Sequence, residues 1–163
     1  MSNPIRPTDN EARRLARELM ASATFAALGT LSADNRPLVT RVSLGLCPKG
    51  WPLSLISSLA LHSQALRSNA EASLLIGEPG PKGDPLTHPR LTLQCKAVFV
   101  ENQSAEHKEL AAHYLRDHPK AKLYIGFSDF SFVRFTPYIG YLNGGFGKAF
   151  QLQTKDLIQT DLA

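Results

Sequence analysis

The sequence predicts a mainly β fold with α-helices, in which helices pack against the outside of an antiparallel barrel or curled sheet. Most of its short apolar segments alternate apolar and polar residues and are separated by Gly, Pro, Asn or Asp, which is typical of strands joined by hairpins. Strands and helices do not alternate regularly, which argues against a doubly wound nucleotide-binding fold. With 163 residues, 43% of them hydrophobic, the chain fits one domain over residues 1–163.

The first half of the chain is expected to hold two helices and several strands. Apolar residues recur at helical spacing after Thr8 and Asp9, either of which is a suitable N-cap for a helix. Residues 33–37 carry the turn chemistry of a β-hairpin. Helices are expected at 10–22 and 59–68, and strands at 25–31, 38–46, 51–57 and 70–77.

The second half begins with a Gly- and Pro-rich segment, Gly77 to Pro89, which predicts a loop. A mobile loop is one interpretation of this segment. A long alternating strand is expected at 90–101, followed by a helix that opens at Ser104 and ends near Pro119. Two last strands are expected at 130–135 and 138–142, separated by Thr136 and Pro137, before a glycine-rich corner at 144–147.

Charge and cysteine content narrow the class of protein. The 18 Lys and Arg and 14 Asp and Glu give a net charge of +4, and the cations are spread along the chain without a basic arm, so we expect no nucleic-acid binding. Cys47 and Cys95 lie far apart without a CxxC motif and are expected to be small buried side chains. No segment is apolar enough to span a bilayer or resembles a signal peptide, so we expect no membrane association and a cytoplasmic location.

Familiar catalytic and metal-binding motifs do not occur. The sequence contains no GxGxxG, Walker A, HExxH or GxSxG motif, and it identifies no catalytic residue. His107, His113 and His118 are spaced six and five residues apart, which does not place two imidazoles on one helix face. They are therefore better explained by a solvated helix face, and no metal site is predicted.

A phosphate-binding site is the most informative pattern. Arg41 lies on a predicted strand, and Ser57, Ser58, His62 and Ser63 lie where the next strand runs into a helix. A phosphate dianion needs several hydrogen-bond donors, and this pattern offers a guanidinium, hydroxyls and the backbone N–H groups of a helix N-terminus. The alternative is that Ser57 or Ser58 only caps the helix and that Arg41 is an exposed strand residue.

The segments 37–44, 55–63 and 69–76, followed by 84–91 and 144–149, resemble in order the FMN-binding split barrels related to pyridoxamine 5'-phosphate oxidase. The resemblance is strongest to the branch that contains haem-utilisation oxygenases, and it covers residues 10–152. It implies a six-stranded antiparallel split barrel that forms a homodimer, with FMN at each end of the subunit interface. Haem-degrading members of this family carry an additional C-terminal helical domain, which we do not expect in this single-domain chain of 163 residues.

The resemblance implies roles for eight residues. Arg41, His62 and Ser63 would bind the FMN phosphate, Ser57 and Ser58 would lie beneath the ribityl chain, and Arg90 would approach the flavin ring. Val42 and Ser43 would line the isoalloxazine with backbone groups. The family commonly has an aspartate after the first serine and a threonine after the histidine, where this chain has Ser58 and Ser63.

Three functions follow from these patterns. The first is an FMN-dependent oxidoreductase or flavin carrier that acts on an unidentified small molecule. The second is a haem-binding or haem-degrading protein built on the same barrel. The third is a dimeric interaction module that has lost its ligand. The first is the function that the sequence favours.

Overall fold

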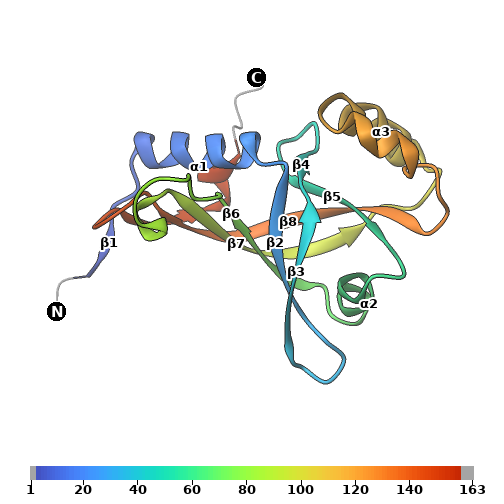
Figure 1. Ribbon diagram of the computed structural model, residues 1–163, viewed down its shortest axis with the longest axis horizontal. Helices are drawn as coiled ribbons and strands as arrows, with labels where there is room; N and C mark the ends of the chain where they lie inside the picture. Colours follow the sequence, from blue (N-terminus) through green and yellow to red (C-terminus); the bar gives the residue numbers. More distant parts are fainter. Residues whose placement is uncertain (1–2, 159–163) are drawn as a thin grey trace.

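The computed structural model describes residues 3–158, which form one sheet of nine strands with four α-helices and two 3-10 turns around it (Figure 1). The strands are β1 Ile5–Arg6, β2 Phe25–Leu31, β3 Pro37–Ser43, β4 Gly45–Leu46, β5 Pro52–Ser57, β6 Glu71–Ile76, β7 Arg90–Phe99, β8 Phe130–Asn143 and β9 Ala149–Gln153. The helices are α1 Asn10–Ser22, α2 Leu61–Ser68, α3 Ala105–Asp117 and α4 Thr154–Leu157, and the 3-10 turns are η1 Pro85–Thr87 and η2 Pro119–Leu123.

The predicted mainly β fold with helices is confirmed, but the sheet differs from six antiparallel strands. Its hydrogen-bonded path runs β1-β9-β8-β7-β6-β2-β3, with β5 bonded to β8 and to β4, and the path does not close on itself. The short β1 pairs with β9 in parallel, whereas all the other pairs are antiparallel among the described residues. Strands of two residues, such as β1 and β4, carry no alternation that a sequence pattern can detect.

The two strands expected at 130–135 and 138–142 are one strand, so the predicted break at Pro137 is wrong. Pro137 lies opposite Cys95 at a register shift between β7 and β8. On its other side β8 pairs with β5 up to Arg134 and with β9 from Ile139 onward. Proline has no N–H to donate, and here the strand passes between two partners, so the missing donor costs little.

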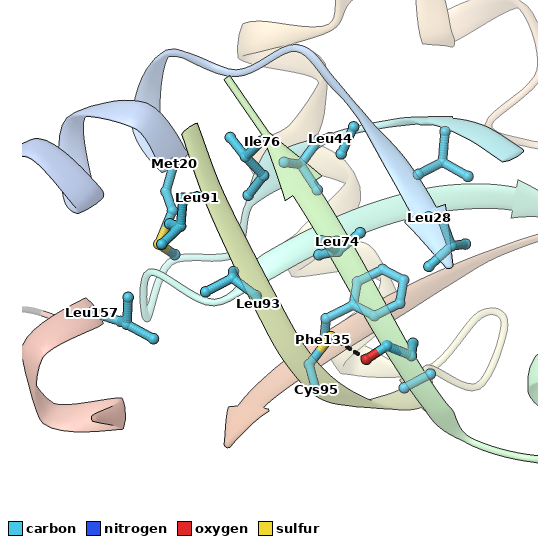
Figure 2. Close-up of a cluster of buried hydrophobic side chains, with 14 of the residues drawn as sticks. Met20, Leu28, Leu44, Leu74, Ile76, Leu91, Leu93, Cys95, Phe135 and Leu157 are labelled. Carbon is cyan, nitrogen blue, oxygen red and sulfur yellow. Dashed lines mark hydrogen bonds between the residues drawn. The ribbon is translucent and has the colours of Figure 1, made fainter. Parts of the chain in front are cut away.

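Two clusters of buried side chains make up the core. The larger cluster fills the inside of the curled sheet and is closed at one end by α1 (Figure 2). Its largest members, including Leu28, Leu74, Leu93 and Phe135, come from adjacent strands and are fully buried. The smaller cluster lies under α3 and contains Leu53, Leu110, Tyr114 and Phe132.

Helix α1 has the bounds and the cap that the sequence predicts. The Asp9 carboxylate accepts a hydrogen bond from the backbone N–H of Ala12 at 2.8 Å and satisfies one of the free donors of the first turn. Ala12, Ala16 and Met20 recur at helical spacing and bury one face of α1 against the larger cluster.

The predicted helix at 59–68 begins two residues later, at Leu61, because Ser57 to Ala60 form the turn that precedes it. Cys47 and Cys95 are buried, with 4% and 0% exposure, which confirms them as small core side chains. The glycine-rich corner is also present, and Gly145 has a φ of 120°, which only glycine adopts readily.

None of the helices formed by residues 3–158 is long and apolar enough to cross a membrane.

Candidate functional site

Strand β3 presents its residues alternately on two faces of the sheet. Thr40 lies opposite the fully buried Leu28 of β2, whereas Arg41 lies opposite the half-buried Ala27. Successive side chains of a strand point to opposite faces. Thr40 therefore lies on the core side of β3 and Arg41 on the outer side, and Val42 returns to the core with 5% exposure.

The turn between β5 and α2 brings the predicted serines together. The Ser57 hydroxyl donates to the Asp129 carboxylate at 2.7 Å and accepts from the Leu59 backbone N–H at 3.2 Å. The buried Ser63 hydroxyl donates to the Ser57 carbonyl. Ser58 is exposed, and its backbone N–H donates to the Asp129 carbonyl at 2.7 Å. Ser57 and Ser63 thus stabilise the turn, but neither Ser57 nor Ser58 caps α2, whose N-cap residue is Ala60 without a side-chain hydrogen bond.

Asp129 was not predicted as a site residue. It lies in the connection between η2 and β8, 72 residues from Ser57, and only the folded chain brings the two together. No local sequence signal indicates this contact. Its carboxylate next to the serines opposes a phosphate dianion at this position, because like charges at short distance repel.

His62 is held by Thr40. The Nδ1 atom of His62 lies 3.0 Å from the Thr40 hydroxyl, which joins α2 to β3. Burial lowers the pKa of His62 below its ordinary value, because desolvation disfavours the imidazolium. The imidazole is therefore neutral at physiological pH. Exposed apolar side chains flank it on the same turn, with Leu59 79% and Leu61 65% exposed.

Arg41 lies in a cleft on the outer side of β3. The cleft has a volume of about 630 Å³ and is lined by the C-terminal end of α1, strands β2 and β3, and residues 77–79. The Arg41 guanidinium lies over the Phe25 ring at 5.3 Å from the ring centre, a cation–π contact. Val39 and Leu75 add apolar surface. The cleft combines the Arg41 guanidinium with an aromatic ring, and Glu78 is among its lining residues.

Arg90 and Ser43 are engaged elsewhere. The Arg90 guanidinium donates to the Leu86 carbonyl at 3.0 Å and so binds the loop 77–89 to the start of β7. The Ser43 hydroxyl accepts from the Tyr114 hydroxyl at 2.7 Å, which connects the end of β3 to α3. Burial raises the pKa of Tyr114 to about 12, so this donor stays protonated.

The structure brings Ser57, Ser58 and Ser63 together in the turn before α2 and joins His62 to Thr40, the neighbour of Arg41 on β3. A phosphate shared by the Arg41 guanidinium and the serine-rich turn stays a prediction. No group of three or more His, Cys, Asp or Glu side chains within residues 3–158 is arranged to hold a metal ion. The site is thus a neutral imidazole beside apolar side chains on one face of β3 and an arginine cleft on the other.

The fold and this site define a protein of the β-barrel class whose candidate ligand-binding residues gather around one edge strand. The chain belongs to the CREG β-barrel family, because the family model matches residues 7–158.

Two relatives are similar over nearly the whole described barrel. The non-canonical heme oxygenase HOZ, chloroplastic, of Arabidopsis thaliana is 31% identical over an alignment of 155 positions, which covers 90% of this chain and 46% of that protein. This chain thus spans about half the length of that curated relative. The solved structure of a heme binding protein from Mycobacterium smegmatis superposes with a TM-score of 0.82 at 30% identity, over 94% of this chain and 61% of that one.

A more distant structure shows the fold alone. It is a protein related to general stress protein 26, of the pyridoxinephosphate oxidase family, from Clostridium acetobutylicum. Its identity is 15% and its TM-score is 0.68, over 92% of this chain and 99% of that one. These likenesses confirm the predicted split-barrel type of fold and its haem-related neighbours, whereas FMN binding stays a prediction.

Proposed function

We propose that this chain binds haem at the surface where β5 passes into α2. The observation that carries the proposal is the neutral, half-buried imidazole of His62, which is bonded to Thr40 and follows the exposed side chains of Leu59 and Leu61 in the chain. Haem is a flat, largely apolar disc with an iron centre, so it needs apolar contact together with a ligand for iron. The haem-related names of the two similar proteins support the same class of ligand.

The donor set suits haem better than a bare metal ion. A bare ion needs several protein ligands, and no suitable cluster occurs within residues 3–158. Haem supplies the equatorial nitrogens itself, so that one protein side chain is sufficient to attach the iron. Haem, when bound, would supply the redox chemistry of its iron. Thr40 would orient the imidazole, and Leu59 and Leu61 would supply apolar contact to the porphyrin.

Haemin titration followed by absorbance tests this function. We expect a saturable Soret band that reaches its plateau at a stoichiometric haem-to-protein ratio. Leu61→Asp should weaken haem affinity about tenfold, since about 1.4 kcal/mol of apolar contact is lost. Leu123→Asp is the matched control, because Leu123 is 80% exposed on η2, and it should bind as the unmodified protein does. The absence of saturation would contradict the proposal.

FMN is the second candidate ligand, and the cleft around Arg41 is the observation that favours it. A guanidinium over the Phe25 ring, at the mouth of a cleft of about 630 Å³, suits a phosphate attached to an aromatic ring. An oxidoreductase activity would then come from the bound flavin, with a substrate still to be identified. The Asp129 carboxylate beside Ser57 makes the serine-rich turn a poorer phosphate site than the sequence predicts.

Quenching of flavin fluorescence measures FMN binding directly. Arg41→Ala should weaken it by about 1.5–3 kcal/mol, the range for a hydrogen bond to a charged group. Arg36→Ala is the matched control, because Arg36 pairs with Asp34 on the exposed turn before β3. Equal FMN affinity in the two variants would count against Arg41 as the phosphate ligand.

A homodimer is part of the same proposal. The outer face of the sheet exposes large apolar side chains on three strands, namely Val39 at 71%, Leu75 at 46%, Tyr138 at 51% and Tyr141 at 41%. Between them lies a groove lined by small residues, because Gly29 of β2 pairs with Ser73 of β6. A second copy packed on this face would remove these side chains from water.

A further inference from the structure

Haem binding through an imidazole requires a ring nitrogen with a free lone pair that points out of the protein. Two of the five histidines cannot supply one. In the loop 77–89, His88 Nδ1 accepts from the Gly80 backbone N–H at 3.2 Å and Nε2 bonds the Lys82 carbonyl at 2.8 Å. On α3, the Arg116 guanidinium donates to His113 Nδ1, which leaves the proton of the neutral ring on Nε2.

Two other histidines lie against the smaller core cluster. The His118 ring stacks on Tyr114 with 4.1 Å between ring centres, and both of its nitrogens are buried. The His107 ring packs against Phe132 at 5.3 Å, with Nδ1 buried. The His118 ring therefore cannot face a large disc without withdrawal of α3 from the barrel, and the His107 ring is held on one side by Phe132.

His62 remains, and its environment fits a ligand. The Thr40 hydroxyl can accept from the Nδ1–H of His62, and this tautomer leaves the lone pair of Nε2 free. No group within residues 3–158 forms a hydrogen bond with Nε2. Ligating histidines commonly donate their other ring N–H to a fixed oxygen, which sets the tautomer and the ring orientation. The pair of Thr40 and His62 has this arrangement before any metal is bound.

The surface around His62 is also suited to a porphyrin. Leu59 and Leu61 precede it and expose most of their side chains. The turn that carries them is held by the hydrogen bonds between Ser57, Ser58 and Asp129, so their positions are fixed by the connection before β8 as well as by β5.

Resting on the proposed haem binding, we infer that Nε2 of His62 is the axial ligand of the haem iron and that Thr40 is the positioning residue that fixes its tautomer. The bond formed is a coordinate bond from the Nε2 lone pair to iron. It displaces water or another weak ligand from the iron, and no electron is transferred.

Absorbance and electron paramagnetic resonance of the ferric haem complex test the ligand. We expect His62→Ala to lose the histidine-ligated spectrum and to regain it when free imidazole is added. His113→Ala is the matched control, the same change at a half-buried histidine on α3, and it should keep the spectrum of the unmodified protein. If the alanine variant does not fold, His62→Gln keeps a polar contact to Thr40 and gives the same expected loss.

Thr40→Val tests the positioning role. Valine has nearly the shape of threonine and lacks the hydroxyl, so the iron ligand stays but the ring loses its fixed partner. We expect the histidine-ligated spectrum to persist while haem affinity falls about 10-fold or more. An affinity equal to that of the unmodified protein would remove Thr40 from the proposal.

The outcomes separate the two proposals. If the unmodified chain shows no saturable haem binding, the proposed function fails. If it binds haem and His62→Ala gives the same spectrum with no response to imidazole, haem binding stands and His62 is not the ligand.

Discussion

At the scale of single residues, the neutral state of His62 predicts how haem binding depends on pH. An imidazole must be deprotonated to bind iron, and burial lowers the pKa of His62. Haem affinity should therefore be constant above the ordinary histidine pKa of about 6.5 and fall only at lower pH. Affinity measured by absorbance across this range should show that fall in the unmodified chain and not in His62→Gln. A decline that sets in above pH of about 6.5 would contradict the prediction.

Tyr114 offers a second test at this scale. Its hydroxyl donates to Ser43, and its ring is fully buried in the smaller core cluster. Tyr114→Phe keeps the ring and removes one hydrogen bond, so the free energy of unfolding should fall by about 0.5–1.5 kcal/mol. Urea denaturation measures this difference. An unchanged midpoint would show that the bond does not hold β3 to α3.

The candidate site was only partly predictable from its single residues. Alternation along a strand already separates Thr40 from Arg41, yet the complementary chemistry of Arg41 and the serines suggested that they converge. In the structure, the alternation of side chains along β3 places Thr40 and Arg41 on opposite faces of the strand. Asp129 could not be predicted, because its contact with Ser57 joins segments 72 residues apart and leaves no local pattern.

At the scale of elements, an ion pair attaches α4 to α1. The Arg13 guanidinium donates to the buried Asp156 carboxylate at 2.7 Å, and the Gln153 backbone N–H donates to its other oxygen. Burial raises the pKa of Asp156, but these two hydrogen bonds and the nearby cations outweigh it, so its pKa lies below the ordinary value. Because the folded pKa is depressed, this stabilisation is complete above the unfolded pKa of about 3.9 and is lost as the pH falls through the folded value.

Asp156→Asn should therefore lower the free energy of unfolding at neutral pH by about 1–3 kcal/mol, because Arg13 loses a charged partner. The difference from the unmodified protein should shrink below pH of about 4. Urea denaturation at pH 7 and pH 3 measures both values. Glu18→Gln is the control on the same helix, because the pair of Arg14 and Glu18 is exposed and should contribute almost nothing. An equal loss in the two variants would refute the role of Asp156.

Helices with a clear hydrophobic periodicity and an N-cap residue were predictable from the sequence. Features that depend on pairing between strands far apart in the sequence were not. The Asp9 cap and the apolar spacing gave α1 its bounds, and Ser104 marked the start of α3, where its hydroxyl accepts from the His107 backbone N–H. Pro137 indicated a strand break by its chemistry alone. Only the arrangement of β5 and β9 beside β8 shows why a proline is tolerated there.

At the scale of the whole molecule, the outer sheet face predicts association between two copies. Val39→Asp places a charge on this face, at its β3 edge, and should shift the sedimentation coefficient from that of a dimer to that of a monomer. Leu123→Asp changes a leucine that is equally exposed but lies on η2, and it should leave the dimer intact. Sedimentation of both variants as the unmodified chain does would exclude this face as the interface.

The class of fold was predictable from hairpin patterning, whereas the order of the strands was not. The pairing of β5 with β8 joins residues 53–57 to residues 130–134, and β1 pairs with β9 across nearly the whole chain. Such long-range contacts are set by how the larger core cluster is enclosed, and the alternation within each strand does not specify them.

A crystal structure of the chain loaded with haem would show which side chain binds the iron. We expect the haem iron within bonding distance of His62 Nε2, with Leu59 and Leu61 against the porphyrin and Thr40 still bonded to Nδ1. Haem bound in the Arg41 cleft, or held by any other side chain with His62 free, would contradict it.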